Sequence, residues 1–117
     1  MTSALIGILE DDGRVSSAYL SLDGYLDSAG FCLVKNWQDE DRIRELISLN
    51  YIYALGIDMS STQPIGNADV ANEDPADLAF RDEDGFWSSV FNWDASYAYL
   101  FKNGKWNISP KLVICSA

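Results

Sequence analysis

Histidine is absent from this sequence of 117 residues, and cysteine occurs only twice. The missing histidine removes both the commonest general base and the commonest metal ligand of proteins. Cys32 and Cys115 are too few and too far apart for a disulfide framework, and without a neighbouring base we expect both to be buried, inert thiols. We therefore expect no enzymatic activity and no cofactor, and a reducing, cytoplasmic location.

Long apolar runs are missing as well. No stretch approaches the roughly 18 consecutive apolar residues that a membrane-spanning helix needs. The apolar segment from Met1 to Leu9 lacks the basic region and the small-residue cleavage site of a secretory signal. We therefore expect no contact with a membrane.

Basic residues are scarce, with eight lysines and arginines against eighteen acidic residues and a formal net charge of −10. Proteins that bind nucleic acid or anionic lipid need clusters of basic side chains, so this balance argues against direct binding of either. A partner with a basic surface is expected instead. The excess is regional, because residues 58–94 hold nine acidic residues and one basic residue.

Asn103 and Gly104 separate two runs of alternating apolar and polar residues, which is the strongest short-range signal for a β-hairpin. Both central residues of the expected type I′ turn need a positive φ, which Asn and Gly tolerate best. This register predicts one buried face, formed by Tyr97, Tyr99, Phe101, Trp106 and Ile108.

A second hairpin is predicted at the start of the chain, where Asp12 and Gly13 lie between the apolar-rich runs 4–9 and 15–22. A two-residue turn there would place Asp11 opposite Arg14 and Ile8 opposite Ser17. Both faces of this hairpin carry apolar residues, which indicates a place inside the sheet rather than at its edge.

Helices are predicted near residues 28–35 and 37–49. In the second, Asn36 and Asp39 resemble a capping box, and Ile43, Leu46 and Ile47 form an apolar stripe. Residues 58–77 predict a long acidic loop, and residues 78–81 a brief return to the sheet. The whole pattern predicts a single α+β domain over residues 1–117, with a mainly antiparallel sheet built from the two hairpins and the helices packed on one side.

Residues 82–93 combine acids and aromatic rings. The turn predicted at Asp82 to Gly85 offers three carboxylates, but it lacks the full loop and closing glutamate of a calcium site, so a solvated acidic turn is favoured. Phe86 and Val90 follow at helix-like spacing and predict a short amphipathic turn. The seven large rings between Trp87 and Trp106 are expected to lie mostly in the core, but they exceed what one small sheet face covers, which leaves an aromatic contact surface for a partner as the alternative.

Several short motifs are spread along the chain: Gly7-Ile8 before the first turn, Tyr19 with Asp23-Gly24-Tyr25, Gly30 and Leu33 before Arg42 to Ile47, Leu55-Gly56, and Tyr99-Leu100-Phe101 with Gly104-Lys105-Trp106. Together they resemble a widespread group of small phage and prophage proteins of unknown function. The resemblance covers the chain apart from the variable loop. It implies a phage origin and carries no activity to transfer.

The acidic segment and the aromatic rings predict a phage counter-defence protein, of the anti-CRISPR or anti-restriction type, whose carboxylates imitate nucleic acid and bind a basic surface of a host protein. Ordinary acidic solubility would explain the same charge. An immunity protein against a basic nuclease toxin, or a phage accessory protein that binds a host regulator through its aromatic patch, are the alternatives. The predicted partner-binding residues are Asp69, Glu73, Asp74, Asp77, Asp82, Glu83, Asp84, Trp87, Trp93 and Asp94.

Overall fold

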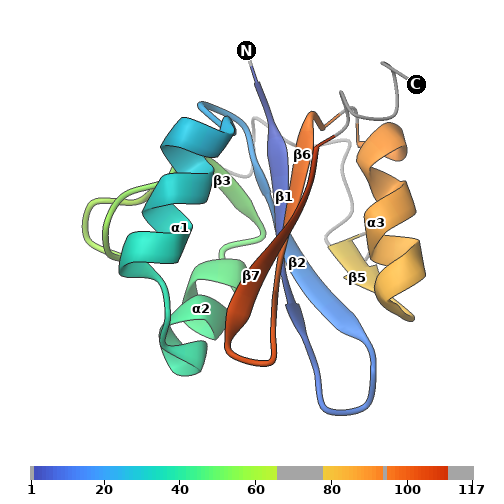
Figure 1. Cartoon of the computed structure of the whole chain (residues 1–117). Helices are drawn as coiled ribbons and strands as arrows, with labels where there is room; N and C mark the ends of the chain where they lie inside the picture. The colour runs from blue at the N-terminus through green and yellow to red at the C-terminus, as the bar shows by residue number, and fades with distance from the viewer. Residues whose placement is uncertain (1, 66–77, 94, 111–117) are drawn as a thin grey trace.

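The computed structural model describes residues 2–65, 78–93 and 95–110. In these residues, seven strands form one mixed sheet in the order β4-β3-β2-β1-β6-β7, and β5 also pairs with β2 (Figure 1). The β1–β6 and β2–β3 pairs are parallel, and the four other pairs are antiparallel. The strands are β1 (Ala4–Leu9), β2 (Val15–Leu20), β3 (Tyr51–Ala54), β4 (Gln63–Pro64), β5 (Ala79–Phe80), β6 (Tyr97–Lys102) and β7 (Lys105–Pro110).

Three α-helices and one short π-helix complete the described part of the chain: η1 (Leu26–Gly30), α1 (Phe31–Asn36), α2 (Glu40–Ile47) and α3 (Glu83–Asn92). The first two α-helices lie where helices are predicted. α2 begins later than the expected capping box, because Asp39 rather than Asn36 is its N-cap and accepts a hydrogen bond from the N–H of Asp41 at 2.9 Å. Its apolar stripe, residues 43, 46 and 47, is buried as predicted.

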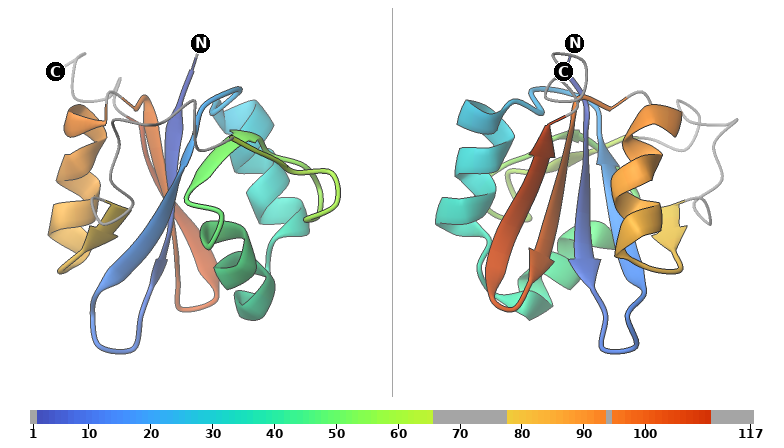
Figure 2. Two further views of the ribbon diagram at one scale, coloured as in Figure 1. Left: turned by 180° about the vertical axis from the view of Figure 1, so that it is seen from behind. Right: turned by 45° about the vertical axis from the view of Figure 1, so that its right-hand side comes forward.

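The helices cover both faces of the sheet, with α1 and α2 on one face and α3 on the other (Figures 1 and 2). The α+β class is confirmed, and the two predicted helices, α1 and α2, pack on one side as expected. α3 is a third helix that covers the other side, and the reason lies in β1, where Leu5 and Ile6 point to opposite faces and both are fully buried. Leu5 packs with Phe86 of α3, and Ile6 packs in the cluster that contains Ile43 of α2, so each face needs its own cover.

The C-terminal hairpin confirms its predicted register, with Phe101 opposite Trp106. Asn103 and Gly104 have φ values of 54° and 75°, as a type I′ turn requires. The Phe101 and Trp106 rings meet edge to face, with centroids 5.2 Å apart. Ile108 is the exception on the predicted buried face: it is 40% exposed because β7 lies at the edge of the described sheet.

The N-terminal hairpin is central in the sheet, as predicted, but its register differs by one residue. Ile8 pairs with Ser16 rather than Ser17, and the loop holds three residues, the last of which is Gly13 with a φ of 90°. A glycine in the left-handed region closes such a three-residue loop. The one-residue shift exchanges the two faces of β2, so Ala18 lies with Ile8 in the core beneath α2.

Two indole rings connect the C-terminal hairpin to the helical layer. Trp106 Nε1 donates a hydrogen bond to the carbonyl of Trp37 at 2.7 Å, and Trp37 Nε1 donates to the carbonyl of Gly56 at 3.0 Å. Trp37 is fully buried, so its donor needs this partner. A Cβ at position 56 would overlap the backbone of Ser61, which makes glycine necessary for this close approach.

The long acidic loop predicted at residues 58–77 is described as far as Ile65. Asp58 accepts hydrogen bonds from the hydroxyl of Ser60 at 2.8 Å and from the N–H of Ser61 at 3.0 Å, and these bonds lower the pKa of its carboxyl group. β4 follows and pairs with β3, which fixes this part of the loop to the sheet. Residues 66–77 lie outside the described residues.

Candidate functional site

Ten residues are predicted to contact a partner, and the structure describes five of them. Asp69, Glu73, Asp74, Asp77 and Asp94 lie outside the described residues. The other five belong to α3 or its flanks: Asp82, Glu83, Asp84, Trp87 and Trp93. The acids lie together at the start of α3, and both tryptophans pack against the core on its side of the sheet.

The acids at 82–84 begin α3 rather than forming a free turn. Asp82 accepts a hydrogen bond from the N–H of Gly85 at 2.8 Å and so caps the helix. Glu83 and Asp84 occupy the first turn, where the helix dipole favours anions. Glu83 also pairs with Lys102 of β6 at 2.9 Å. Asp84 is exposed and has no ion pair among the described residues.

Trp87 and Trp93 are partly buried and contact other rings. Trp87 meets Phe86 edge to face at a centroid distance of 5.1 Å, and Trp93 packs against Tyr19 at 5.4 Å and Tyr51 at 6.4 Å. The aromatic rings exceed what one sheet face covers because they are distributed over two faces, and helices cover both. Of the rings between Trp87 and Trp106, Tyr97, Tyr99, Phe101 and Trp106 lie on the face covered by α1 and α2.

Three acidic groups that are far apart in the sequence come together at one end of the molecule. The β1–β2 loop and the first turns of α2 and α3 all lie at the lower end in Figure 1, and the view from behind in Figure 2 agrees. Only the group at α3 belongs to the predicted site. We call this surface the acidic end; it consists of Glu10, Asp11, Asp12, Asp39, Glu40, Asp41, Asp82, Glu83 and Asp84. Seven of these residues are exposed, and Glu10 and Glu83 are partly buried.

Basic residues near the acidic end are fewer than the acids and mostly engaged. Arg14 pairs with Asp12 at 3.6 Å, Lys102 is held by Glu83, and the Arg42 guanidinium lies over the Trp37 ring at 5.2 Å. The remaining bases there are Arg44, in the network described next, and the exposed Arg81 and Lys105. The carboxylates of residues 11, 39, 41 and 84 have no ion pair among the described residues.

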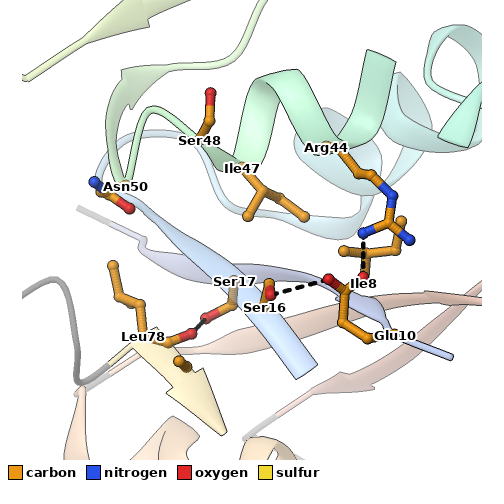
Figure 3. A pocket seen from close by; sticks show the side chains of 10 residues that line it. Ile8, Glu10, Ser16, Ser17, Arg44, Ile47, Ser48, Asn50 and Leu78 are labelled. Carbon is orange, nitrogen blue, oxygen red and sulfur yellow. Dashed lines mark hydrogen bonds and ion pairs between the residues drawn. The ribbon is translucent and has the colours of Figure 1, made fainter. Parts of the chain in front are cut away.

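Arg44 links two acids of this surface. Its guanidinium is in close contact with the carboxylate of Glu10, as Figure 3 shows, and pairs with Glu40 at 2.7 Å. These hydrogen bonds raise the pKa of Arg44, so the side chain stays charged. The hydroxyl of Ser16 donates to the other oxygen of Glu10 at 3.5 Å. The network holds the end of β1 against α2.

Two hollows flank this network. The first, of about 320 Å³, lies between α2 and β5 and includes in its wall Ser16, Arg44, Asn50 and Leu78 (Figure 3). The second, of about 340 Å³, lies between the two hairpin tips and includes in its wall Glu10, Asp11, Glu40, Phe101 and Lys102. Carboxylates beside an apolar wall suit a basic side chain, whose aliphatic stem and charged head need different neighbours.

The most exposed large apolar side chains in the described ranges are not the predicted tryptophans. They lie on or beside α1, on β3 and its following loop, and on β7: Tyr25, Phe31, Val34, Tyr53, Ile57 and Ile108. Helical periodicity from residue 31 onward could have indicated the α1 pair, because Leu33 and Trp37 occupy the buried side and leave residues 31 and 34 outside.

Within residues 2–65, 78–93 and 95–110, no three side chains of the metal-binding types are placed to hold one ion. The same ranges contain no helix long and apolar enough to cross a bilayer. Comparison of the chain with models of protein families, with curated proteins and with solved structures found no match.

Proposed function

We propose that this protein is a phage-encoded counter-defence protein, of the anti-CRISPR or anti-restriction type, that binds a basic, nucleic-acid-binding surface of a host protein through its acidic end. The observation that carries the proposal is the convergence of three acidic groups from separate parts of the chain at one end of the molecule. Concentrated charge of one sign steers an oppositely charged partner and speeds its association.

The form of the acidic end supports mimicry of nucleic acid. Its exposed carboxylates stand on two helix starts and a hairpin loop, so the fold presents them at fixed positions. A channel that binds nucleic acid is lined with lysine and arginine side chains that neutralise phosphates. The hollow between the hairpin tips gives such a side chain a place to insert beside Asp11, whose carboxylate has no ion pair among the described residues, while Glu10 and Glu40 in the same wall already bind Arg44.

The partial burial of Trp87 and Trp93 favours the acidic end over an aromatic patch as the contact surface. Rings that already pack against Phe86 and Tyr19 stabilise the domain and leave little area for a partner. Phage origin rests on the motifs at Asp23-Gly24-Tyr25 and in the C-terminal hairpin, which resemble the phage group.

A plating assay tests the proposal. Bacterial strains that each carry one restriction or CRISPR–Cas system are challenged with a sensitive phage, with and without expression of this chain. We expect expression to restore plating on a defended strain and to leave plating on the undefended parent unchanged. Plating that stays suppressed on every defended strain contradicts the proposal, and rescue of cells from a co-expressed basic nuclease toxin would point to an immunity protein instead.

A further inference from the structure

β7 is the one long edge strand in the described part of the sheet. β4 at the opposite edge and β5 have two residues each, whereas β7 has six. The two-residue turn makes Lys102 and Lys105 a hydrogen-bonded pair, and the bonded pairs alternate along the hairpin. The N–H and C=O groups of Trp106 and Ile108 therefore point away from β6. Such an edge is ready to pair with another strand.

Exposed apolar side chains are found on β7 and on the neighbouring helix α1. Ile108 on β7 is 40% exposed, and Val34 and Phe31 on α1 are 49% and 61% exposed. α1 is tied to β7, because the Trp106 indole donates to the carbonyl of Trp37 directly after the helix. The open edge and the exposed apolar side chains thus belong to neighbouring elements.

Charge indicates what covers this surface. Neither α1 nor β7 contains an acidic residue, and their charged side chains are Lys35 and Lys105. The two other α-helices carry acidic residues in their first turns, and the β1–β2 loop also contains acidic residues. For two copies that each carry a net charge of −10, contact through α1 and β7 brings no acidic side chain of these two elements against the other copy, so repulsion there is small.

We propose that two copies of this chain pair through β7, antiparallel about a two-fold axis near Asn107, so that their sheets become continuous. Each Ile108 then lies opposite Trp106 of the other copy, and the outward N–H and C=O groups of both residues are satisfied. Pro110 has no N–H to donate, so the pairing ends before it. The exposed side of α1 closes over the joined strands through Val34.

Sedimentation and light scattering over about a hundredfold range of concentration test this, because association follows mass action. We expect the mass to rise from 13.0 kDa towards twice that value. Ile108→Glu places like charges across the axis and should remain at 13.0 kDa. The control is Ile57→Glu, which changes an isoleucine that is more exposed than Ile108 and lies beyond β3, at the far side of the sheet, and should still dimerise. Circular dichroism checks that both variants fold.

Amide exchange gives a second, residue-level readout. In the dimer, the N–H groups of Trp106 and Ile108 should exchange slowly, and in Ile108→Glu they should exchange fast. Added salt should favour the dimer, since it screens the repulsion between two acidic copies, whereas binding to a basic partner should weaken. A mass of 13.0 kDa at every concentration, or equal dimerisation of the two variants, overturns the proposal.

Discussion

Tyr99 shows how one buried hydroxyl connects two distant parts of the chain. It is fully buried, and its hydroxyl donates a hydrogen bond to the carbonyl of Gly24 at 2.7 Å. Burial, with a smaller effect of neighbouring Tyr97, raises the pKa of the Tyr99 hydroxyl above its ordinary value of 10.0. The native state therefore keeps this proton at pH values where the unfolded chain releases it.

Tyr99→Phe should be less stable than the parent by about 1 kcal/mol near neutral pH, because the carbonyl of Gly24 loses its donor. The difference should shrink as the pH rises above about 10, where the unfolded parent ionises and the stabilisation by Tyr99 is lost. Urea unfolding at a series of pH values measures this. Tyr25→Phe is the control for removal of a tyrosine hydroxyl from the surface, since Tyr25 is 48% exposed. A constant difference between Tyr99→Phe and the parent contradicts the role given to burial.

Gly104 is the second position where one residue decides local structure. Gly104→Val forces a β-branched residue to a φ of 75° and should cost more than about 1 kcal/mol of the free energy of unfolding. Asn103→Gly is the control, because glycine adopts the φ of 54° found at position 103 without strain. Chemical denaturation compares the two, and similar stabilities would refute the type I′ assignment.

The two hairpins differ in how far their residues fix the register. At Asn103 and Gly104 both residues suit positive φ, and one face of the hairpin is richer in aromatic rings, so turn and pattern agree. At Asp12 and Gly13, a glycine with positive φ fits a two-residue or a three-residue loop. Because both faces of that hairpin are apolar, the hydrophobic pattern does not distinguish a two-residue loop from a three-residue loop. The predicted register is wrong by one residue.

At the scale of elements, Asp82 is the clearest change of interpretation. The sequence places it in an acidic turn, whereas the structure makes it the N-cap of α3. Asp82→Ala should lower the free energy of unfolding by about 1 kcal/mol, because the N–H of Gly85 loses its acceptor. Asp84→Ala, in the same first turn and exposed, should cost less, since it loses only the interaction with the helix dipole. Thermal unfolding of both variants measures the difference, and equal losses would contradict the cap.

Helices are predicted well where apolar periodicity and caps coincide, and less well where they do not. The stripe of α2 is correct, although the cap is Asp39. α3 has ten residues, longer than the short turn that its spacing predicts, because packing of Phe86 and Val90 beneath the sheet stabilises a helix that the local sequence only suggests. Both faces of the N-terminal hairpin are apolar, and a single helical layer would cover only one of them. This pattern indicates a second helical layer.

At the scale of the whole molecule, acidic residues that are separated along the sequence lie together in the fold. The sequence separates residues 58–94 from the acids at 10–12 and 39–41. The fold joins these runs, because the loop after β1, the start of α2 and the start of α3 lie at one end (Figure 1). No local pattern contains this information, since it depends on strand order and on the parallel pairing of β1 with β6.

The arrangement of the acidic end leads to a prediction about binding of the host defence protein that the proposed function assigns as the partner. Asp11→Asn with Asp41→Asn removes two exposed charges from the acidic end and keeps the shape of both side chains. We expect affinity to fall about tenfold, or about 1.4 kcal/mol, mainly through a slower association rate, and the remaining binding to depend less on salt. Asp23→Asn with Asp27→Asn is matched in charge and exposure but lies at the opposite end, after β2, and should bind as the parent does. Surface plasmon resonance at several salt concentrations separates rate from affinity. If both double variants bind alike at every salt concentration, the acidity of this chain serves solubility, and the partner binds elsewhere.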